Sequence, residues 1–254
     1  MKTGKNTEPM FSAIAPRYDL FNHIASLGLD FYWRRKAAQI ACDQRPGRVL
    51  DICCGSGDLA FAIAQTGGAG HITGLDISEP MLAIAREKQK AKNYPVGFEW
   101  VCAEAENTGL ETETFDVITC AFGMRNIVDK QSAMKEAYRL LRDGGKICIL
   151  EFALPKKFPL RQICLVYLRF ALSTVGFLLL GKAAPTRYLY GSILDWDKNA
   201  GAEKLLEDGG FEDIKKISLV AGAVCLHTAR KLKNKNVDGA PPSVIGRGYR
   251  RPGR

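Results

Sequence analysis

The sequence is poor in the residues that build metal centres and disulfide frameworks. It contains three histidines among 254 residues, and none of its eight cysteines belongs to a Cys-x-x-Cys pair. No set of His, Cys and Asp residues has metal-ligand spacing, so we expect no bound metal. The cysteines stand singly or as the neighbours Cys53 and Cys54, and several lie in apolar runs. This usage predicts free thiols in a reducing compartment, and therefore a cytoplasmic protein.

Two further absences concern the ends of the chain. The opening stretch MKTGKNTEP has no apolar run of the kind that forms a secretory signal peptide, and we expect residues 1–9 to be flexible. Residues 230–254 contain eight Lys or Arg and one acid, which leaves the rest of the chain close to neutral. We expect 231–254 to be a disordered basic tail, either solubilising or in contact with anionic lipid or nucleic acid.

Long apolar runs are also missing, with one exception. Residues 163–180 (ICLVYLRFALSTVGFLLL) carry a single charge, Arg169, and reach the lower length limit of a membrane span. An arginine in the middle of a span is costly in lipid. We therefore expect an apolar helical lid over about 158–190. It is either buried against the domain or lies at a membrane interface and faces a hydrophobic ligand.

Apolar runs of strand length alternate with helical patterns along residues 10–230. This alternation predicts a parallel sheet covered by helices on both faces. Only residues 220–222 separate the last two strands, so the final strand must run antiparallel. The fold class is therefore α/β, Rossmann-like, with a mostly parallel seven-stranded sheet. We expect strands at 48–53, 71–76, 98–102, 115–121, 146–152, 214–219 and 223–228, and helices at 10–40, 58–65, 79–92, 130–141 (closed by Asp143-Gly144-Gly145) and 202–207.

The most informative segment is VLDICCGSGD at 49–58, followed by GLDIS at 74–78. Gly55, Gly57 and Ala60 form a G-x-G-x-x-A turn, which alone also fits a dinucleotide site. Asp51 changes the balance, because an acid beside this turn repels a pyrophosphate but attracts the ammonium and sulfonium of S-adenosylmethionine. Asp76, at the tip of the second strand, suits both ribose hydroxyls. We therefore predict an S-adenosylmethionine site of the class I type, and the alternative is an acid that only caps a helix.

Other residues at the same edge of the sheet complete the predicted cofactor site. Ser56 lies in the glycine turn, where the backbone can approach a ligand closely. Glu104 is placed to accept a hydrogen bond from the adenine amino group, although a solvated loop acid is the alternative. Ala105 offers its backbone N–H to the adenine. Ile77 and Ala121 follow or end neighbouring strands, and we include them in the site.

Four blocks of sequence resemble the ubiquinone/menaquinone biosynthesis C-methyltransferases, the UbiE/MenG family. They are MFSAIAPRYDLFN (10–22), VLDICCGSGD (49–58), AFGMRNIVD (121–129) and YRLLRDGGKICILEF (138–152). The glycine loop is shared by many methyltransferases, whereas AFGMRN together with APRYD is far more specific. The resemblance spans residues 10–230 and implies methyl transfer to a ring carbon of a polyprenylated quinol.

Some positions depart from the pattern of that family. Glu104 stands where Asn or Asp is usual, and Lys182 and Thr186 stand where acidic and aromatic residues are common. Leu194-Asp195-Trp196-Asp197 replaces a Phe-Pro-Asp run, and 111–114 lacks the usual Pro-Phe-Pro. These changes fall on the predicted acceptor lid and adenine rim. They bear on the identity of the substrate more than on the type of reaction.

Under this resemblance, three residues are candidates for catalysis. Arg125 is expected to stabilise an oxyanion or to orient a water that accepts the ring proton, unless it pairs with Asp129 or another local acid. Asn126 is expected to hold a ring hydroxyl. Tyr18 belongs to an N-terminal helix that closes over the cofactor, although simple packing is the alternative. His227 lies away from the strand tips, and a structural role with satisfied hydrogen bonds is favoured over that of a base.

Several functions stay open at this point. The leading one is a demethylmenaquinone methyltransferase. The alternatives are its ubiquinone-pathway counterpart, a methyltransferase of another lipid-like acceptor, and a cofactor-binding scaffold of a quinone-assembly complex. The partners expected are the polyprenylated quinol, the membrane surface on its inner face as a peripheral contact, and a second copy in a homo-oligomer. No nucleic-acid partner is expected.

Overall fold

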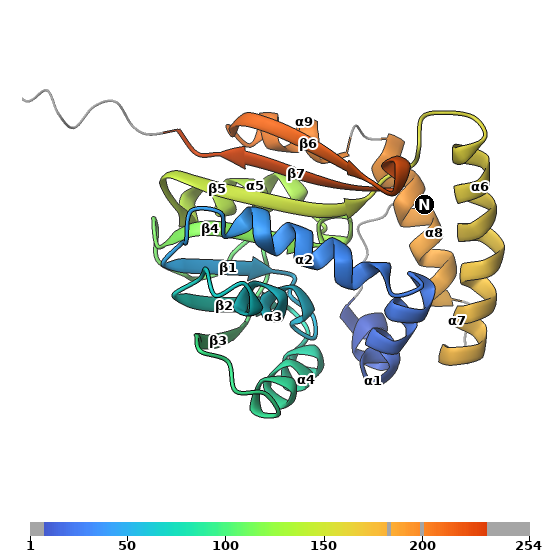
Figure 1. Ribbon diagram of the computed structural model, residues 1–254, viewed down its shortest axis with the longest axis horizontal. Coiled ribbons are helices and arrows are strands. Elements are labelled where there is room, and N and C mark those ends of the chain that lie inside the picture. Colours follow the sequence, from blue (N-terminus) through green and yellow to red (C-terminus); the bar gives the residue numbers. More distant parts are fainter. Residues whose placement is uncertain (1–7, 182–183, 199–200, 233–254) are drawn as a thin grey trace, which may run out of the picture.

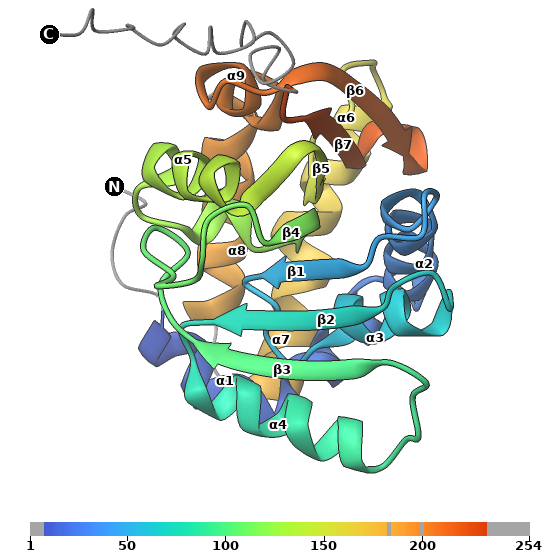
Figure 2. The same ribbon diagram turned by 90° about the vertical axis from the view of Figure 1, so that its left-hand side faces the viewer.

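The sheet determines the architecture of the protein. A computed structural model describes residues 8–181, 184–198 and 201–232. Its seven strands lie in the order β3-β2-β1-β4-β5-β7-β6 (Figures 1 and 2), and β7 runs antiparallel to both of its neighbours. The predicted fold class is thereby confirmed. The strands are β1 (Arg48–Ile52), β2 (His71–Asp76), β3 (Gly97–Cys102), β4 (Phe115–Ala121), β5 (Leu141–Phe152), β6 (Glu212–Leu219) and β7 (Val224–Arg230).

Helices cover both faces of the sheet, because the central strands are apolar on both sides. Alternate residues of β1 divide between two buried clusters, with Val49 packed toward α2 and α3 and Leu50 toward α5 and α9. Figure 2 shows these two helical layers on opposite sides of the strands. The helices are α1 (Glu8–Ala25), α2 (Leu29–Ala41), α3 (Asp58–Gln65), α4 (Glu79–Lys90), α5 (Lys130–Leu140), α6 (Leu160–Val166), α7 (Leu172–Leu180), α8 (Ala184–Lys198) and α9 (Gly201–Asp208).

Two predicted boundaries are wrong. The helical pattern over 10–40 is two helices, because Leu27 and Gly28 take left-handed backbone conformations with φ of 54° and 76° and end the first one. The Asp143-Gly144-Gly145 stretch does not close a helix. The helix ends at Leu140, and β5 begins at once with a bulge, since Phe115 pairs with Leu141 but Val117 pairs with Lys146. The residues expected to form the flexible start and basic tail lie almost wholly outside the described residues.

The lid is a long apolar helix with two different faces. Helices α6 and α7 are joined by a π-turn at Tyr167–Ala171 and stand beside α8 at the end of the sheet where α1 also lies (Figure 1). Leu168 and Leu172 pack inward with Phe21 of α1. The outer face is exposed at Ile163, Val166, Phe170, Phe177 and Leu178. The stretch Leu160–Leu179 is long and apolar enough to cross a membrane, although its length and composition are weak evidence that it does so.

The contact between α7 and α8 depends on a glycine. A Cβ at Gly176 would lie 2.0 Å from Cγ2 of Thr186. We predict that Gly176→Ala lowers the free energy of unfolding by about 1–3 kcal/mol, the usual cost of overpacking. Gly191→Ala in α8 is the matched control, because nothing lies within 4 Å of its Cβ position and alanine favours helix. Denaturant unfolding measures both, and equal stability of the two variants would contradict the prediction.

Candidate functional site

A cavity of about 150 Å³ lies where the carboxyl ends of β1, β2 and β4 meet the glycine turn. Phe11 and Tyr18 of α1 border it from outside the sheet. All the predicted site residues except Gly57 and Arg125 border this cavity. They are Tyr18, Asp51, Gly55, Ser56, Asp76, Ile77, Glu104, Ala105, Ala121 and Asn126. The alternation of strands and helices thus places in one cavity residues that are separated by more than a hundred positions in the chain.

Asp51 borders this cavity with one hydrogen-bond acceptor that has no donor within the described part of the chain. Its side chain is buried, and one carboxylate oxygen accepts a hydrogen bond from the Thr119 hydroxyl at 2.7 Å. The other oxygen, Oδ2, is buried without a hydrogen-bond partner among the described residues. Burial raises the pKa of Asp51 to about 7, and the Thr119 bond only partly opposes this. A buried acceptor without a donor is the feature expected where a cationic ligand group binds.

Asp76 organises the glycine turn as well as facing the cavity. Its Oδ2 accepts from the backbone N–H of Gly55 at 2.8 Å, and its Oδ1 accepts from the N–H of Ser78 at 2.9 Å. The alternative of a capping acid is therefore part of its role, since Ser78 is the N-cap of α4. Burial raises the pKa of Asp76, while these backbone donors lower it. The carboxylate still borders the cavity, so a ligand hydroxyl would meet an acceptor that is already fixed in place.

Gly57 is the one predicted cofactor-site residue that does not border the cavity. A Cβ there would lie 2.8 Å from the Trp100 ring and 2.9 Å from the Phe61 ring. Its φ of 86° also favours glycine. Gly55, at φ 55°, has open space in front of it and fits the expectation of close ligand approach. The second glycine thus serves packing beneath the turn.

A hydrogen bond and two ion pairs join α1 to the glycine turn and its neighbouring helices. The Ser56 hydroxyl donates to Asp19 at 2.5 Å, so it is already engaged within the protein. Lys88 of α4 lies 2.6 Å from the other Asp19 oxygen and 2.7 Å from Asp58. Asp19, Ser56, Asp58 and Lys88 therefore join α1, the turn, α3 and α4 beside the cavity.

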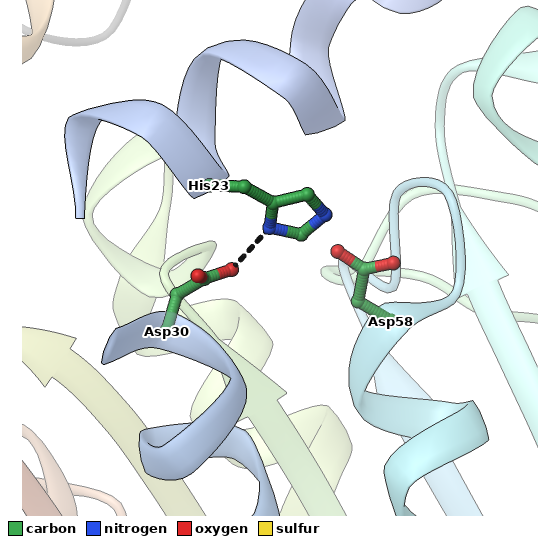
Figure 3. Close-up of side chains that lie close together, drawn as sticks. All are labelled: His23, Asp30 and Asp58. Atoms are coloured by element: carbon green, nitrogen blue, oxygen red, sulfur yellow. Dashed lines mark hydrogen bonds and ion pairs between the residues drawn. The ribbon is translucent and has the colours of Figure 1, made fainter. Parts of the chain in front are cut away.

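A cluster of His23, Asp30 and Asp58 continues this network (Figure 3). Their nearest ligand-type atoms lie within 4.8 Å of one another, which the sequence spacing did not indicate. Arg34 ion-pairs with Asp30 and lies 3.7 Å from Asp58, and Lys88 also pairs with Asp58, so both carboxylates already have cationic partners. Within the described residues, the cluster therefore has the character of a partly buried ion-pair network. Arg34 itself also borders the cavity, and the sequence analysis missed it.

A second, apolar cavity of about 390 Å³ adjoins the first. The two share four bordering residues, Phe11, Tyr18, Arg34 and Phe122. The wall of the second cavity comes from α1, the lid helices and the ends of β5 and β7, and its apolar members include Phe21, Trp33, Phe152, Ile163, Leu168, Leu172 and Leu189. Tyr188 borders this cavity, whereas Arg187 is exposed and does not. A polar and an apolar compartment thus meet at Tyr18.

Arg125 and Asn126 lie at this meeting point and are already hydrogen-bonded. The guanidinium of Arg125 borders the apolar cavity and pairs with Glu151 at 2.6 Å, so the acid beside it is Glu151 and not Asp129. Asp129 instead caps α5 through Ser132. Asn126 accepts a hydrogen bond from the Tyr188 hydroxyl at 3.0 Å. Glu151 was missed, although an apolar strand ending in a carboxylate is the same signal that singled out Asp51 and Asp76.

His227, predicted to have a structural role, falls outside the two cavities. His227 is buried in β7, and neither ring nitrogen has a hydrogen-bond partner among the described residues, so the expectation of satisfied hydrogen bonds is wrong. Burial lowers its pKa to about 4. The cysteines of the described chain are free thiols: Cys120 and Cys148 are buried, and Cys53 and Cys54 border the first cavity.

Comparison with known proteins agrees with this geometry. The profile of the ubiE/COQ5 methyltransferase family matches residues 2–231. A demethylmenaquinone methyltransferase of Thermus thermophilus is 36% identical over 218 residues, covering 86% of this chain and 98% of the relative. A ubiquinone/menaquinone biosynthesis C-methyltransferase UbiE of Geotalea daltonii is 33% identical, covering 90% and 97%.

Solved structures support the fold alone. A structure from Methanococcus maripaludis, described as an S-adenosyl-L-methionine-dependent methyltransferase, aligns with a TM-score of 0.61 at 18% identity. The alignment covers 87% of this chain and 94% of that one. The similarity confirms the class I architecture and says nothing of the acceptor.

The raised pKa of Asp51 predicts that the charge needed for binding costs stability. The unfolded carboxyl ionises near pH 4 and the folded one near pH 7, so stability falls as the pH rises through this window and levels off above it. Asp51→Asn lacks this titration. We expect this substitution to stabilise the unliganded protein more at pH 8 than at pH 4.5. The difference between the two changes in the free energy of unfolding should be about 1–4 kcal/mol.

Denaturant unfolding at both pH values measures this difference. Asp208→Asn, at a half-exposed acid paired with Lys204, is the control and should change stability equally at the two pH values. A pH-independent effect of Asp51→Asn would show that no buried charge is removed.

Proposed function

The chain belongs to the ubiE/COQ5 methyltransferase family, and from this premise we propose that it methylates demethylmenaquinol to menaquinol. It is an S-adenosylmethionine-dependent C-methyltransferase of quinone biosynthesis. The observation that carries the proposal is the junction of a polar, acid-lined cavity with a larger apolar one at Tyr18. The acid-lined cavity suits a water-soluble, cationic methyl donor, and the apolar cavity suits a hydrophobic acceptor.

The charged residues around the first cavity fit S-adenosylmethionine. When bound, this donor supplies a sulfonium-activated methyl group to a carbon nucleophile. The free oxygen of Asp51 would accept from its ammonium group, and Arg34 would pair with its carboxylate. Asp76 would take the ribose hydroxyls, with Gly55 allowing close approach, and Glu104, Ala105 and Ile77 would border the adenine. Ala121 and Ser56 complete the wall.

The residues at the junction would align the quinol. A quinol ring carbon is made nucleophilic by its hydroxyl groups, so the site must bind the oxygen and exclude water. Arg125 would stabilise the developing phenolate, and Tyr18 would hold the ring against the cofactor cavity. Asn126 would act together with Tyr188, since their hydrogen bond fixes both. The apolar wall of the second cavity would bury the first isoprene units.

A benzoquinol acceptor is the second candidate. The Geotalea relative bears a name that covers both ubiquinone and menaquinone biosynthesis. The apolar cavity is suited to a prenylated ring of either kind. We therefore treat the nucleus of the ring as a question for the experiment below.

We further propose that the lid lies on the inner face of the cytoplasmic membrane as a peripheral contact. The exposed apolar face of α6 and α7 carries Phe170 and Phe177, and exposed Lys156 and Lys157 stand just before it. Apolar residues flanked by cations bind the interface of anionic lipid. Ile163 both lines the apolar cavity and is exposed, so the cavity opens on this face. A prenyl tail could then enter from the bilayer.

Quinone analysis tests the acceptor. We expect cells that lack the gene to accumulate a naphthoquinone lighter by one methyl group, because the transfer to demethylmenaquinol is blocked. Mass spectrometry of extracted quinones detects it, and the wild-type gene should restore menaquinone while Arg125→Ala should not. A lighter benzoquinone would instead identify the ubiquinone branch. An unchanged quinone profile would contradict the proposed function.

Vesicle flotation tests the membrane contact. We expect the purified protein to float with phosphatidylglycerol vesicles and less with phosphatidylcholine ones, because the lysines favour anionic lipid. The double variant Phe170→Asp, Phe177→Asp should lose most of the bound fraction, since it puts charges on the docking face. Ile217→Asp, at an exposed apolar position of edge strand β6, is the control and should float normally. Equal recovery with and without vesicles would refute the contact.

A further inference from the structure

Glu151 is a buried carboxylate to which the reaction described above gives no role. It lies near the carboxyl end of β5 and is fully buried. Its Oε1 accepts from the Arg125 guanidinium at 2.6 Å and from the backbone N–H of Phe152 at 2.8 Å. Its Oε2 accepts from the backbone N–H of Arg125 at 3.3 Å. One side chain thus binds both the main chain and the side chain of Arg125.

These bonds use only one part of the guanidinium. The Nη1 group of Arg125 donates to Glu151 and also to the carbonyl oxygen of Phe122. The ring of Phe152 lies 5.2 Å from the guanidinium carbon and covers its face. Among the described residues, Nε is buried without a partner, and no hydrogen bond joins Nη2 to another group. Nε and Nη2 therefore donate to no other group among the described residues, and Arg125 borders both the apolar cavity and a further cavity of about 270 Å³.

We infer that Glu151 is a positioning residue for methyl transfer, because it holds one edge of Arg125 so that the other edge receives the acceptor oxygen. The inference rests on the proposed function for the identity of that oxygen, a ring hydroxyl or phenolate of the quinol. A guanidinium edge with two parallel N–H groups matches an oxyanion well. Without the carboxylate, the long arginine side chain would have several orientations, and its charge would be buried without compensation.

Glu151 also sets the electrostatic field at the acceptor. Arg125 alone would lower the pKa of a nearby phenol, and the carboxylate beside it offsets part of that effect. The charged or titratable groups around this pair include Tyr18 from α1, Arg34 from α2, Lys130 from α5 and Tyr188 from α8. Asp195 of α8 and Lys204 and Asp208 of α9 border the cavity of about 270 Å³ together with Arg125 and Lys130. Burial raises the pKa of Tyr188, with Arg125 lowering it and Glu151 raising it. The same opposition would act on a bound quinol hydroxyl.

The experiment compares Glu151→Gln, Glu151→Asp and the wild-type protein. The first substitution keeps the shape and removes the charge, and the second keeps the charge and shortens the side chain. Glu136→Gln is the matched control, because Glu136 is also an ion-paired acid, with Arg139, but does not border either cavity. The probe is p-nitrophenol, whose bound phenolate is followed by its visible absorption across pH. The pH dependence of kcat with a short-chain demethylmenaquinol is measured alongside.

We expect Glu151→Gln to lower the pKa of bound p-nitrophenol by about one unit, since the Arg125 charge is no longer offset. The pH of half-maximal kcat should fall by a similar amount. Glu151→Asp should keep both midpoints and lower kcat at least about tenfold with a smaller change in KM, because the guanidinium edge is displaced. It also serves as the test if Glu151→Gln does not fold. Glu136→Gln should match the wild type.

Two results would overturn the inference. One is that the pKa of bound p-nitrophenol and the pH of half-maximal kcat are the same in the wild type and in Glu151→Gln, while only stability is reduced. A purely structural role of Glu151 predicts this result. The other is a wild-type protein that methylates quinol but does not perturb the probe. A probe shift without methylation of any quinol would support the role of Glu151 toward Arg125 and refute the proposed function instead.

Discussion

Asp51, Asp76 and Glu151 are carboxylates near the ends of three strands of one sheet, and the fold buries Asp51 and Glu151 fully and Asp76 partly. Burying a carboxylate is costly unless donors or cations compensate it. Each of the three is compensated in a different way. Asp76 receives two backbone N–H groups, Glu151 receives Arg125, and Asp51 receives one hydroxyl and keeps an oxygen without a partner.

The different compensation of these three carboxylates gives them different roles at the edge of the sheet. A carboxylate that accepts hydrogen bonds from donors within the chain fixes those groups in place. Asp76 fixes the glycine turn in this way, and Glu151 fixes Arg125. A carboxylate with an oxygen left over needs a donor from outside the chain, and this is the position of Asp51. Of the three carboxylates, the one with an oxygen left without a donor in the described chain is therefore the one with most to gain from a cationic ligand.

The sequence predicted the fold and the polar half of the site because both depend on local patterns. Apolar runs that end in Asp51 and Asp76 mark strand ends, and the turn between them marks the glycine loop. Arg34 and Lys88 could not be assigned, because each approaches Asp58 from a different helix, and Lys88 meets Asp19 only when α1 packs beside α4. The bulge at the start of β5 was missed for a related reason. Asp143-Gly144-Gly145 suits a turn locally, and only the register with β4 turns it into part of a strand.

Helix α1 links the two compartments through neighbouring residues. Tyr18 borders both cavities, and Asp19, the next residue, bonds to Ser56 of the glycine turn and to Lys88. Because the two are adjacent in the chain, the contact of Asp19 fixes the place of Tyr18 at the junction. The helix must therefore be docked on the cofactor side before the acceptor compartment has its full wall. Phe21 of the same helix packs against the lid residues Leu168 and Leu172. The docked position of α1 therefore also fixes the lid, whose outer face is proposed to meet the membrane.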